Sequence, residues 1–349
     1  MGTMSVHGGD LPHLDPHEHG YADILRRVLI PATAVEPRLA LGPTATLAGL
    51  SEVLSWALRG QGADETASVW IENLRWARCL GLRLDEGAPV PPTARWEPTA
   101  PQARGCGIDD ADAATREALP KAQMQYPARH DLPWADSAAF LPRLVPVALF
   151  PVDSLAHVGQ LAVNITALTH GSPEALATGM TWTLLLRSLL GARDDAASDE
   201  QLILDGCSRC LDLMPPAGSP GGPQGLRSQY AAMGGSLTGL GAIYAAAPRT
   251  VAMLRDVVGL EPLAEDPAAT GGPACVEVLR RALTALLGEE GEPPRRDAAF
   301  GLGHVLRGAL GHETAGAEDA ASDPSAIDSL TLVWNQWLGL VRDWEPAAS

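Results

Sequence analysis

The sequence is poor in charge, and most of the charge it has is of one sign. Only 19% of its 349 residues are Asp, Glu, Lys or Arg, below the roughly 25% that is usual for soluble domains. Basic residues number 25 against 42 acidic ones, which gives a formal net charge of −17 at pH 7. Negative charge on this scale repels phosphate backbones, so the composition argues against general nucleic-acid binding.

Long apolar runs and a disulfide framework are also missing. No stretch reaches the ~18 uninterrupted apolar residues of a membrane span, and the first residues lack the basic and apolar regions of a secretory signal. The 5 cysteines are an odd number scattered along the chain, unlike those of disulfide-bonded domains. We therefore expect a cytoplasmic protein without a membrane partner. Lys121 is the only lysine, which, with the Ala, Gly and Pro content, suggests an actinobacterial or other GC-rich genome.

Apolar residues make up 46% of the chain, and from Leu25 onward they recur with a helical period. In the range 46–60, for example, Leu47, Leu50 and Leu54 lie on one stripe. No alternating β pattern of useful length occurs, so the sequence predicts an all-α fold. The pattern predicts helices over residues 46–60, 66–80, 154–168, 174–190, 251–258, 273–287, 298–310 and 326–344.

The organisation predicted from composition is a leader followed by one domain. Residues 1–20 are polar, broken by Gly and Pro, and read as a flexible leader; its histidines (His7, His13, His17 and His19) could bind a transition metal weakly, although an unstructured tail is the better reading. Residues 21–349 then form a single helical domain. Loop insertions are predicted near 85–112, 214–225 and 259–272.

The short motifs are individually weak. Cys207 and Cys210 form a lone CxxC, for which Cys275 is the one plausible further zinc ligand, so packing on a helix is the better interpretation. The Gly-rich run 234–241 follows no strand and precedes no Gly-Lys-Ser/Thr, which argues against a phosphate loop.

Two acidic clusters, at residues 109–112 and 194–195, could bind a divalent cation. Such clusters are more typical of solvated turns or of helix amino termini.

A more informative pattern is distributed along the chain. Residues 167–175 read ALTHGSPEA and connect two predicted helices, and residues 137–149 read SAAFLPRLVPVAL shortly before them. In these segments the chain resembles the ADP-ribosylglycohydrolase family, whose members carry "ALTHGDPEA"-like and "GNGSLMRVAPLAL"-like sequences in the same order. Residues 42–44 stand at the place of an early "DDT" motif, and residues 325–329 at the place of a late "GGDTDT" motif. The resemblance covers roughly residues 22–342.

The resemblance implies an orthogonal multi-helix bundle that binds a pair of Mg²⁺ ions between helices and cleaves a glycosidic bond to ADP-ribose. This chain departs from the family at the metal positions. Gly42 and Pro43 replace the early acidic residues and Ala326 replaces the first late aspartate. Magnesium requires hard oxygen ligands, and two close dications need several anionic ones. We therefore predict no metal site and no metal cofactor, although the family would use Mg²⁺.

The residues that remain at family positions are the predicted site. His170 and Asp328 are the candidate catalytic groups, as an acid or base and as a carboxylate. The candidate ligand-binding residues are Thr44, Ser137, Arg143 and Ser329. Each has a structural alternative: a histidine between helices is often a hydrogen-bonding cap, and Asp328 could simply interact with a helix dipole. Trp334 and Trp337 are expected to pack in the core or line the cleft, and not to stack on a nucleotide base.

Three hypotheses follow. The first is a non-catalytic descendant, a pseudoenzyme that binds a small molecule in the inter-helix cleft or a protein partner. The second is a metal-independent enzyme with a repurposed cleft for a specialised-metabolism substrate, in which Arg143 would clamp an anion. The third is a weak ADP-ribosyl hydrolase whose metal ligands come from elsewhere, such as Asp136 or Asp323.

Overall fold

The computed structural model describes ten stretches of the chain: residues 14–18, 20–35, 37–98, 112–192, 197–213, 237–260, 273–288, 291–294, 297–312 and 324–344. Within these stretches the regular structure is helical, and the one β pairing is an isolated bridge between Tyr126 and Arg129. The predicted all-α fold is therefore confirmed. In chain order the helices are η1 (Leu25–Leu29), α1 (Ile30–Val35), η2 (Pro37–Leu39), α2 (Leu41–Ala57), α3 (Glu65–Cys79), α5 (Ala113–Ala118), η4 (Pro142–Leu144), α6 (Val145–Ala148), α7 (Leu155–Ala167), α8 (Pro173–Leu190), α9 (Asp199–Asp212), α11 (Leu237–Ala245), α12 (Pro248–Val257), α13 (Ala274–Leu286), α14 (Ala298–Ala309) and α16 (Pro324–Arg342).

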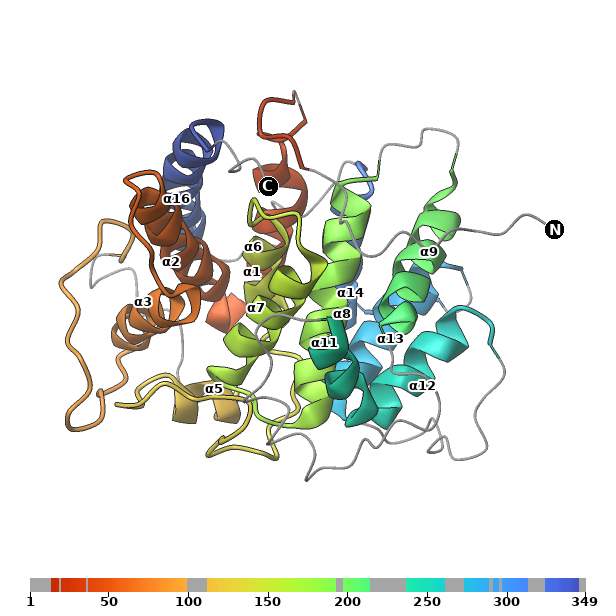
Figure 1. The fold of residues 1–349 in the computed structure, drawn as a ribbon, viewed down its shortest axis with the longest axis horizontal. Helices are drawn as coiled ribbons and strands as arrows, with labels where there is room; N and C mark the ends of the chain where they lie inside the picture. Colours follow the sequence, from red (N-terminus) through yellow and green to blue (C-terminus); the bar gives the residue numbers. More distant parts are fainter. Residues whose placement is uncertain are drawn as a thin grey trace.

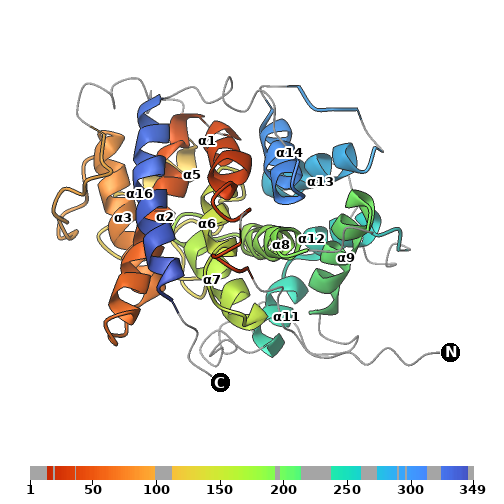
Figure 2. The same ribbon diagram turned by 90° about the horizontal axis from the view of Figure 1, so that it is seen from above.

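Helix α8 is the centre of the fold. It contacts α6, α7, α9, α11, α12, α13 and α14, and Figure 2 shows it almost end-on between the other helices. Its start is encoded locally, because the Ser172 side chain accepts a hydrogen bond from the Ala175 amide and Pro173 occupies the first turn. Its sequence is apolar on nearly all sides, which suits a helix that is surrounded by others.

Helices α2, α3 and α16 form a layer on one side of α8 (Figures 1 and 2). Helix α2 packs on both α3 and α16. Gly49 permits the close approach of α2 to α3, since a Cβ there would lie 2.7 Å from the Cα of Val69. Trp334 and Trp337 are buried on α16, where Trp334 stacks on Tyr21 and Trp337 donates a hydrogen bond to the Tyr21 hydroxyl at 3.0 Å. Of the two alternatives for these tryptophans, core packing is the one observed.

The structure can be compared directly with several of the local predictions. Cys207 and Cys210 are buried on α9, and burial raises the pKa of both thiols, so they pack as apolar groups. From the predicted leader, Leu14 is buried in the core and His17 is exposed; His7, His13 and His19 lie outside the described residues. So do the acidic residues 109, 110, 194 and 195 and the start of the Gly-rich run 234–241.

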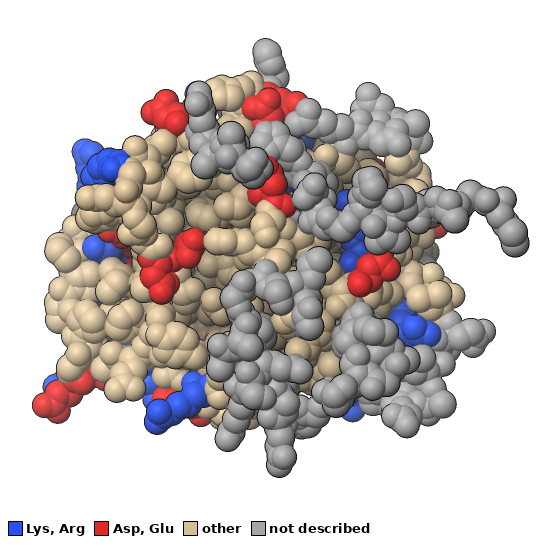
Figure 3. Space-filling view, viewed as in Figure 1, with Lys and Arg blue, Asp and Glu red and all other residues tan. Residues whose placement is uncertain are grey.

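The surface of the described residues carries scattered charge. In the face shown in Figure 3, a few acidic and basic side chains are scattered over a mostly uncharged surface. Among the described helices, none is long and apolar enough to cross a membrane.

A buried carboxyl group fastens the loop 85–98 to α3. The Trp96 indole donates a hydrogen bond to Glu72 at 2.9 Å, and Arg75 donates to the other oxygen of the same carboxyl group. Burial outweighs the attraction of Arg75 and raises the pKa of Glu72 to about 7, and the nearby Glu97 adds to the rise.

We expect Glu72→Gln to gain stability relative to the wild type as the pH rises. A carboxyl group whose folded pKa is raised contributes stability at low pH, and that contribution is lost as the pH rises toward about 7. The neutral amide keeps an acceptor for Trp96 and does not titrate. Chemical denaturation at pH 5 and pH 8 should show a relative gain of about 1–3 kcal/mol, and the exposed Glu86→Gln should show none. A constant difference between Glu72→Gln and the wild type at the two pH values would contradict the prediction.

Candidate functional site

The site is built at the junction between α7 and α8. Helix α7 ends at Ala167, and α8 begins at Pro173 after its Ser172 cap. Thr169 and His170 lie between the two helices, and both are fully buried. The Thr169 hydroxyl and the His170 ring are hydrogen-bonded to each other, with 2.7 Å between Oγ1 and Nδ1.

Arg143, from η4, is buried against this junction. Its Nη2 group donates to the carbonyls of Ile165 and Thr166, at 3.1 and 3.2 Å, and to the Thr169 hydroxyl. A cation at the carboxyl end of a helix is favoured by the helix dipole. Burial lowers the pKa of Arg143 to about 9, so the side chain still carries its positive charge at neutral pH. The guanidinium therefore serves as the cap of α7.

The donors in this network determine the tautomer of His170. Arginine only donates, so the Thr169 hydroxyl accepts from Arg143 and has its own proton for Nδ1 of His170. The imidazole then carries its proton on Nε2 and donates it to the Ser137 hydroxyl, at 2.8 Å. In this arrangement His170 is neutral, in agreement with the lowering of its pKa by burial. A histidine with a protonated Nε2 is not available as a base for Ser137.

Asp112 completes the cluster from the other side. It is the cap of α5, where its carboxylate accepts a hydrogen bond from the Thr115 amide at 2.8 Å. The carboxylate lies 3.5 Å from Nε2 of His170 and also interacts with the Ser137 hydroxyl. Burial acts to raise the pKa of Asp112, but the hydrogen bonds from His170, Thr115 and Ser137 outweigh it and hold the pKa below its usual range. The Asp112 side chain is 14% exposed, so the network reaches solvent at a carboxylate.

The early motif lies within helix α2, although the predicted helix begins only at residue 46. Residues 42–44 lie inside the first turn of α2, where Pro43 is tolerated because no helical partner is needed for its nitrogen. A Cβ on Gly42 would lie 3.1 Å from the Trp76 ring and 3.4 Å from Cβ of Arg143. The space next to Gly42 is thus filled by an indole and by the stem of a buried cation. Thr44 is fully buried, and its hydroxyl has no hydrogen-bond partner among the described residues.

The late motif lies on α16, away from the polar cluster of the junction. Ser329 and Ala326 are buried, whereas Asp328 is exposed. The structure therefore brings Ser137, Arg143 and His170 together, and it places Asp328 on a solvent-facing side of another helix. The roles predicted for these residues, and for Thr44 and Ser329, stay predictions.

The residues that the structure describes do not supply the ligand set of a pair of Mg²⁺ ions. The described residues contain no group of three or more His, Cys, Asp or Glu side chains that could hold a metal. A Cβ at position 42 would already be in tight contact with the Trp76 ring and in contact with the Cβ of Arg143, which leaves little room for a carboxylate side chain, and the nearby guanidinium would repel a dication. Of the alternative ligands, Asp136 is partly buried, and Asp323 lies outside the described residues.

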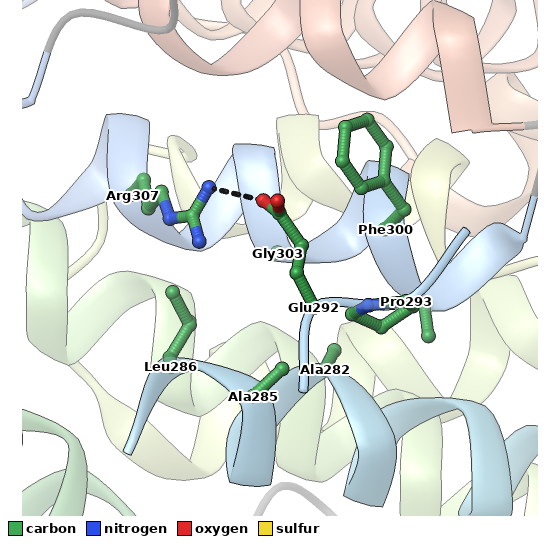
Figure 4. A pocket seen from close by; sticks show the side chains of 9 residues that line it. Ala282, Ala285, Leu286, Glu292, Pro293, Phe300, Gly303 and Arg307 are labelled. Atoms are coloured by element: carbon green, nitrogen blue, oxygen red, sulfur yellow. Dashed lines mark hydrogen bonds and ion pairs between the residues drawn. The ribbon is translucent and has the colours of Figure 1, made fainter. Parts of the chain in front are cut away.

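A separate hollow lies between α13 and α14 and contains none of the predicted site residues (Figure 4). Its lining is mostly apolar, and its two charged side chains neutralise each other, with Arg307 donating to Glu292 at 3.1 Å. The cavity volume of the hollow is only about 10 Å³, far below the roughly 300–1,000 Å³ of typical ligand pockets.

Sequence reasoning missed three members of the polar cluster. Asp112 was visible only as part of an acidic run, although its spacing to Thr115 is that of a helix cap. Thr169 was read as part of a turn, and its link between Arg143 and His170 depends on the fold. His130, which holds the neighbouring loop, carried no sequence signal.

Comparison with known families and proteins gives one match. The family model described as ADP-ribosylglycohydrolase matches residues 44–312, a range that contains Ser137, Arg143, His170 and Asp112. No curated protein and no solved structure matches the chain.

Proposed function

Since the chain belongs to the ADP-ribosylglycohydrolase family, we propose that it is a non-catalytic member that binds a ligand without Mg²⁺-dependent hydrolysis of ADP-ribosyl groups. The observation that carries the proposal is the packing around Gly42. Trp76 and the buried Arg143 occupy the side of α2 on which an acidic residue would have to reach a metal. No step of a metal-dependent hydrolysis is supported by these residues.

The groups at the solvent-facing end of the polar cluster favour a particular chemical class of ligand. The groups that reach solvent are the carboxylate of Asp112 and the partly buried hydroxyl of Ser137. Arg143 is only 2% exposed, so it is not presented to a diphosphate in solution, although its Nε and Nη1 have no hydrogen-bond partner among the described residues. Trp134 stands 58% exposed on the loop just before Ser137. This combination suits a small ligand that presents amino or hydroxyl groups to a carboxylate and an apolar face to an indole.

The experiment has a metal arm and a ligand arm. Calorimetry with ADP-ribose, and release of ADP-ribose from ADP-ribosyl-arginine, should give the same result with Mg²⁺ and with a chelator. Metal-dependent heat or release would overturn the proposal in favour of the weak hydrolase. In the second arm, a thermal-shift panel of amino sugars and polyols should contain compounds whose effect is lost in Asp112→Asn and kept in the exposed control Glu86→Gln. A panel without such compounds would contradict the ligand class.

One distance favours the metal-independent enzyme as a second candidate. Ser137 Oγ and His170 Nε2 are 2.8 Å apart, within the range of a nucleophile and its base. The candidate requires the opposite tautomer, with the proton on Nδ1, which leaves the Thr169 proton without an acceptor among the described contacts. Reaction of Ser137 with a phosphonate ester that is lost in His170→Gln would support this candidate over the binding protein.

A further inference from the structure

His130 bridges a loop and the carboxyl end of α7. Its Nδ1 accepts the amide proton of Leu132 at 2.8 Å, and its Nε2 lies 2.7 Å from the carbonyl oxygen of Ala167. An amide only donates and a carbonyl only accepts, so both bonds form only when the proton is on Nε2 and Nδ1 is bare. A doubly protonated imidazole would direct an N–H at the Leu132 N–H and lose that bond.

The bridge is part of a larger attachment of this loop. The amide of Gly171 donates to the carbonyl of Leu132 at 3.2 Å, and the amide of Ser172 donates to the carbonyl of Ala135 at 3.3 Å. Gly171 also lies against the imidazole, since a Cβ there would be 2.3 Å from Cγ of His130. The loop is thus held directly on the α7–α8 junction.

The attached loop leads into the polar cluster. Leu132 and Ala135 pack against Ala114 and Ala118 of α5, the helix that Asp112 caps. Ser137 follows Ala135 by two residues and contacts His170. A change in the attachment at His130 is therefore transmitted along a few residues of chain to the hydroxyl at the solvent end of the network.

We propose that His130 is a positioning residue that acts as a proton-controlled latch: in its neutral form it fastens residues 130–137 to the α7–α8 junction, and its protonation releases them. The inference does not depend on the proposed function, because it concerns only the attachment of the loop. For any ligand that contacts Ser137, it predicts weaker binding in acid.

The groups around His130 determine the pH at which the latch opens. Burial lowers the pKa of His130, and proximity to His170 and to the charged Arg143 lowers it further, while the Ala167 carbonyl and Asp131 oppose the change. Lys121 lies 3.5 Å from Asp131 and partly neutralises it. The net direction is downward, so the latch is closed at neutral pH and opens below the ordinary pKa of histidine, about 6.5.

Hydrogen exchange of assigned amides tests the proposal. Between about pH 7.5 and pH 4.5, protection of the Leu132, Gly171 and Ser172 amides should fall after correction for intrinsic rates, by up to about tenfold for each pH unit below the folded pKa of His130. Amides in the middle of α8 should keep their protection. In His130→Asn the side-chain oxygen accepts from the Leu132 amide in an Asx-turn and does not titrate. The protection of Leu132 should then be the same at both pH values.

The wild-type protein also provides a test that needs no variant. The ¹⁵N shifts of the His130 ring should identify the tautomer with the proton on Nε2 at neutral pH. Protonation of Nδ1 at that pH would overturn the proposal. So would wild-type protection that does not change with pH, or an equal loss of protection in His130→Asn.

Discussion

Replacement of Arg143 with Ala should lower the free energy of unfolding by about 3–5 kcal/mol. The change removes the donor for the carbonyls of Ile165 and Thr166 and for the Thr169 hydroxyl. The Ile165 and Thr166 carbonyls keep backbone donors from residues 168–170, and the Thr169 hydroxyl keeps its bond to His170. The loss therefore comes chiefly from the cavity that opens beside Gly42 and from the removal of the charged cap at the end of α7. Urea denaturation at neutral pH measures the difference.

Two further variants separate the charge of Arg143 from its volume. Arg143→Met keeps most of the apolar contact with Gly42 and removes the cost of burying a cation, so its loss should be smaller, about 1–3 kcal/mol. The exposed control Arg83→Ala should change stability by less than about 0.5 kcal/mol. If Arg143→Ala cost no more than Arg83→Ala, the guanidinium would be free for a ligand, as the family resemblance implied, and would not be a structural cap.

The Arg143 result bears directly on the metal question. A buried cation that is needed to close α7 cannot leave when a ligand arrives, because its departure would cost the stability measured above. The guanidinium is therefore a fixed positive charge at the end of α7. An acidic side chain restored at position 42 would have to displace the Trp76 ring, and a dication held near the guanidinium would be repelled by it, so we expect that acidic residues at positions 42 and 43 alone do not create a Mg²⁺ site.

Helix ends could be predicted from the sequence where a local signal marks them. Asp64 caps α3 by accepting from the Ala67 amide, and the predicted range 66–80 differs from α3 by one residue at each end. Ser172, Pro173 and Gly191 delimit α8 in the same way. These signals act within a few residues, so they can be read without knowledge of the fold.

The prediction was wrong where tertiary packing decides the outcome. Helix α2 begins at Leu41 and not near Thr46, because Gly42 fits against Trp76 and Arg143 and thereby favours a helical first turn there. The family motifs led correctly to the junction that contains His170. They did not reveal that Asp112, 58 positions earlier, caps a short helix beside it, since no local pattern connects two residues so distant in the chain.

His170→Ala should lower the free energy of unfolding by about 2–4 kcal/mol at pH 7.5. The ring is fully buried and bonded on both nitrogens, to Thr169 and to Ser137, so truncation leaves a cavity and unpaired hydroxyls. His170→Gln should cost less, about 1–2 kcal/mol, because its amide can still donate to Ser137. Denaturation of both variants beside the exposed control His17→Gln measures these differences.

The stability difference between the wild type and His170→Gln should depend on pH, and this dependence identifies the role of the histidine. Burial lowers the folded pKa of His170 below its ordinary value of 6.5. Its contribution to stability is then present above about pH 6.5 and is lost as the pH falls through the folded pKa. In that range, the free energy of unfolding of the wild type should fall toward that of His170→Gln by up to about 1.4 kcal/mol per pH unit. Comparison of the two proteins at each pH cancels the opposite trend of Glu72, which both share. Parallel stability curves would show that His170 does not have to stay neutral for folding, and would return it to consideration as an acid or base.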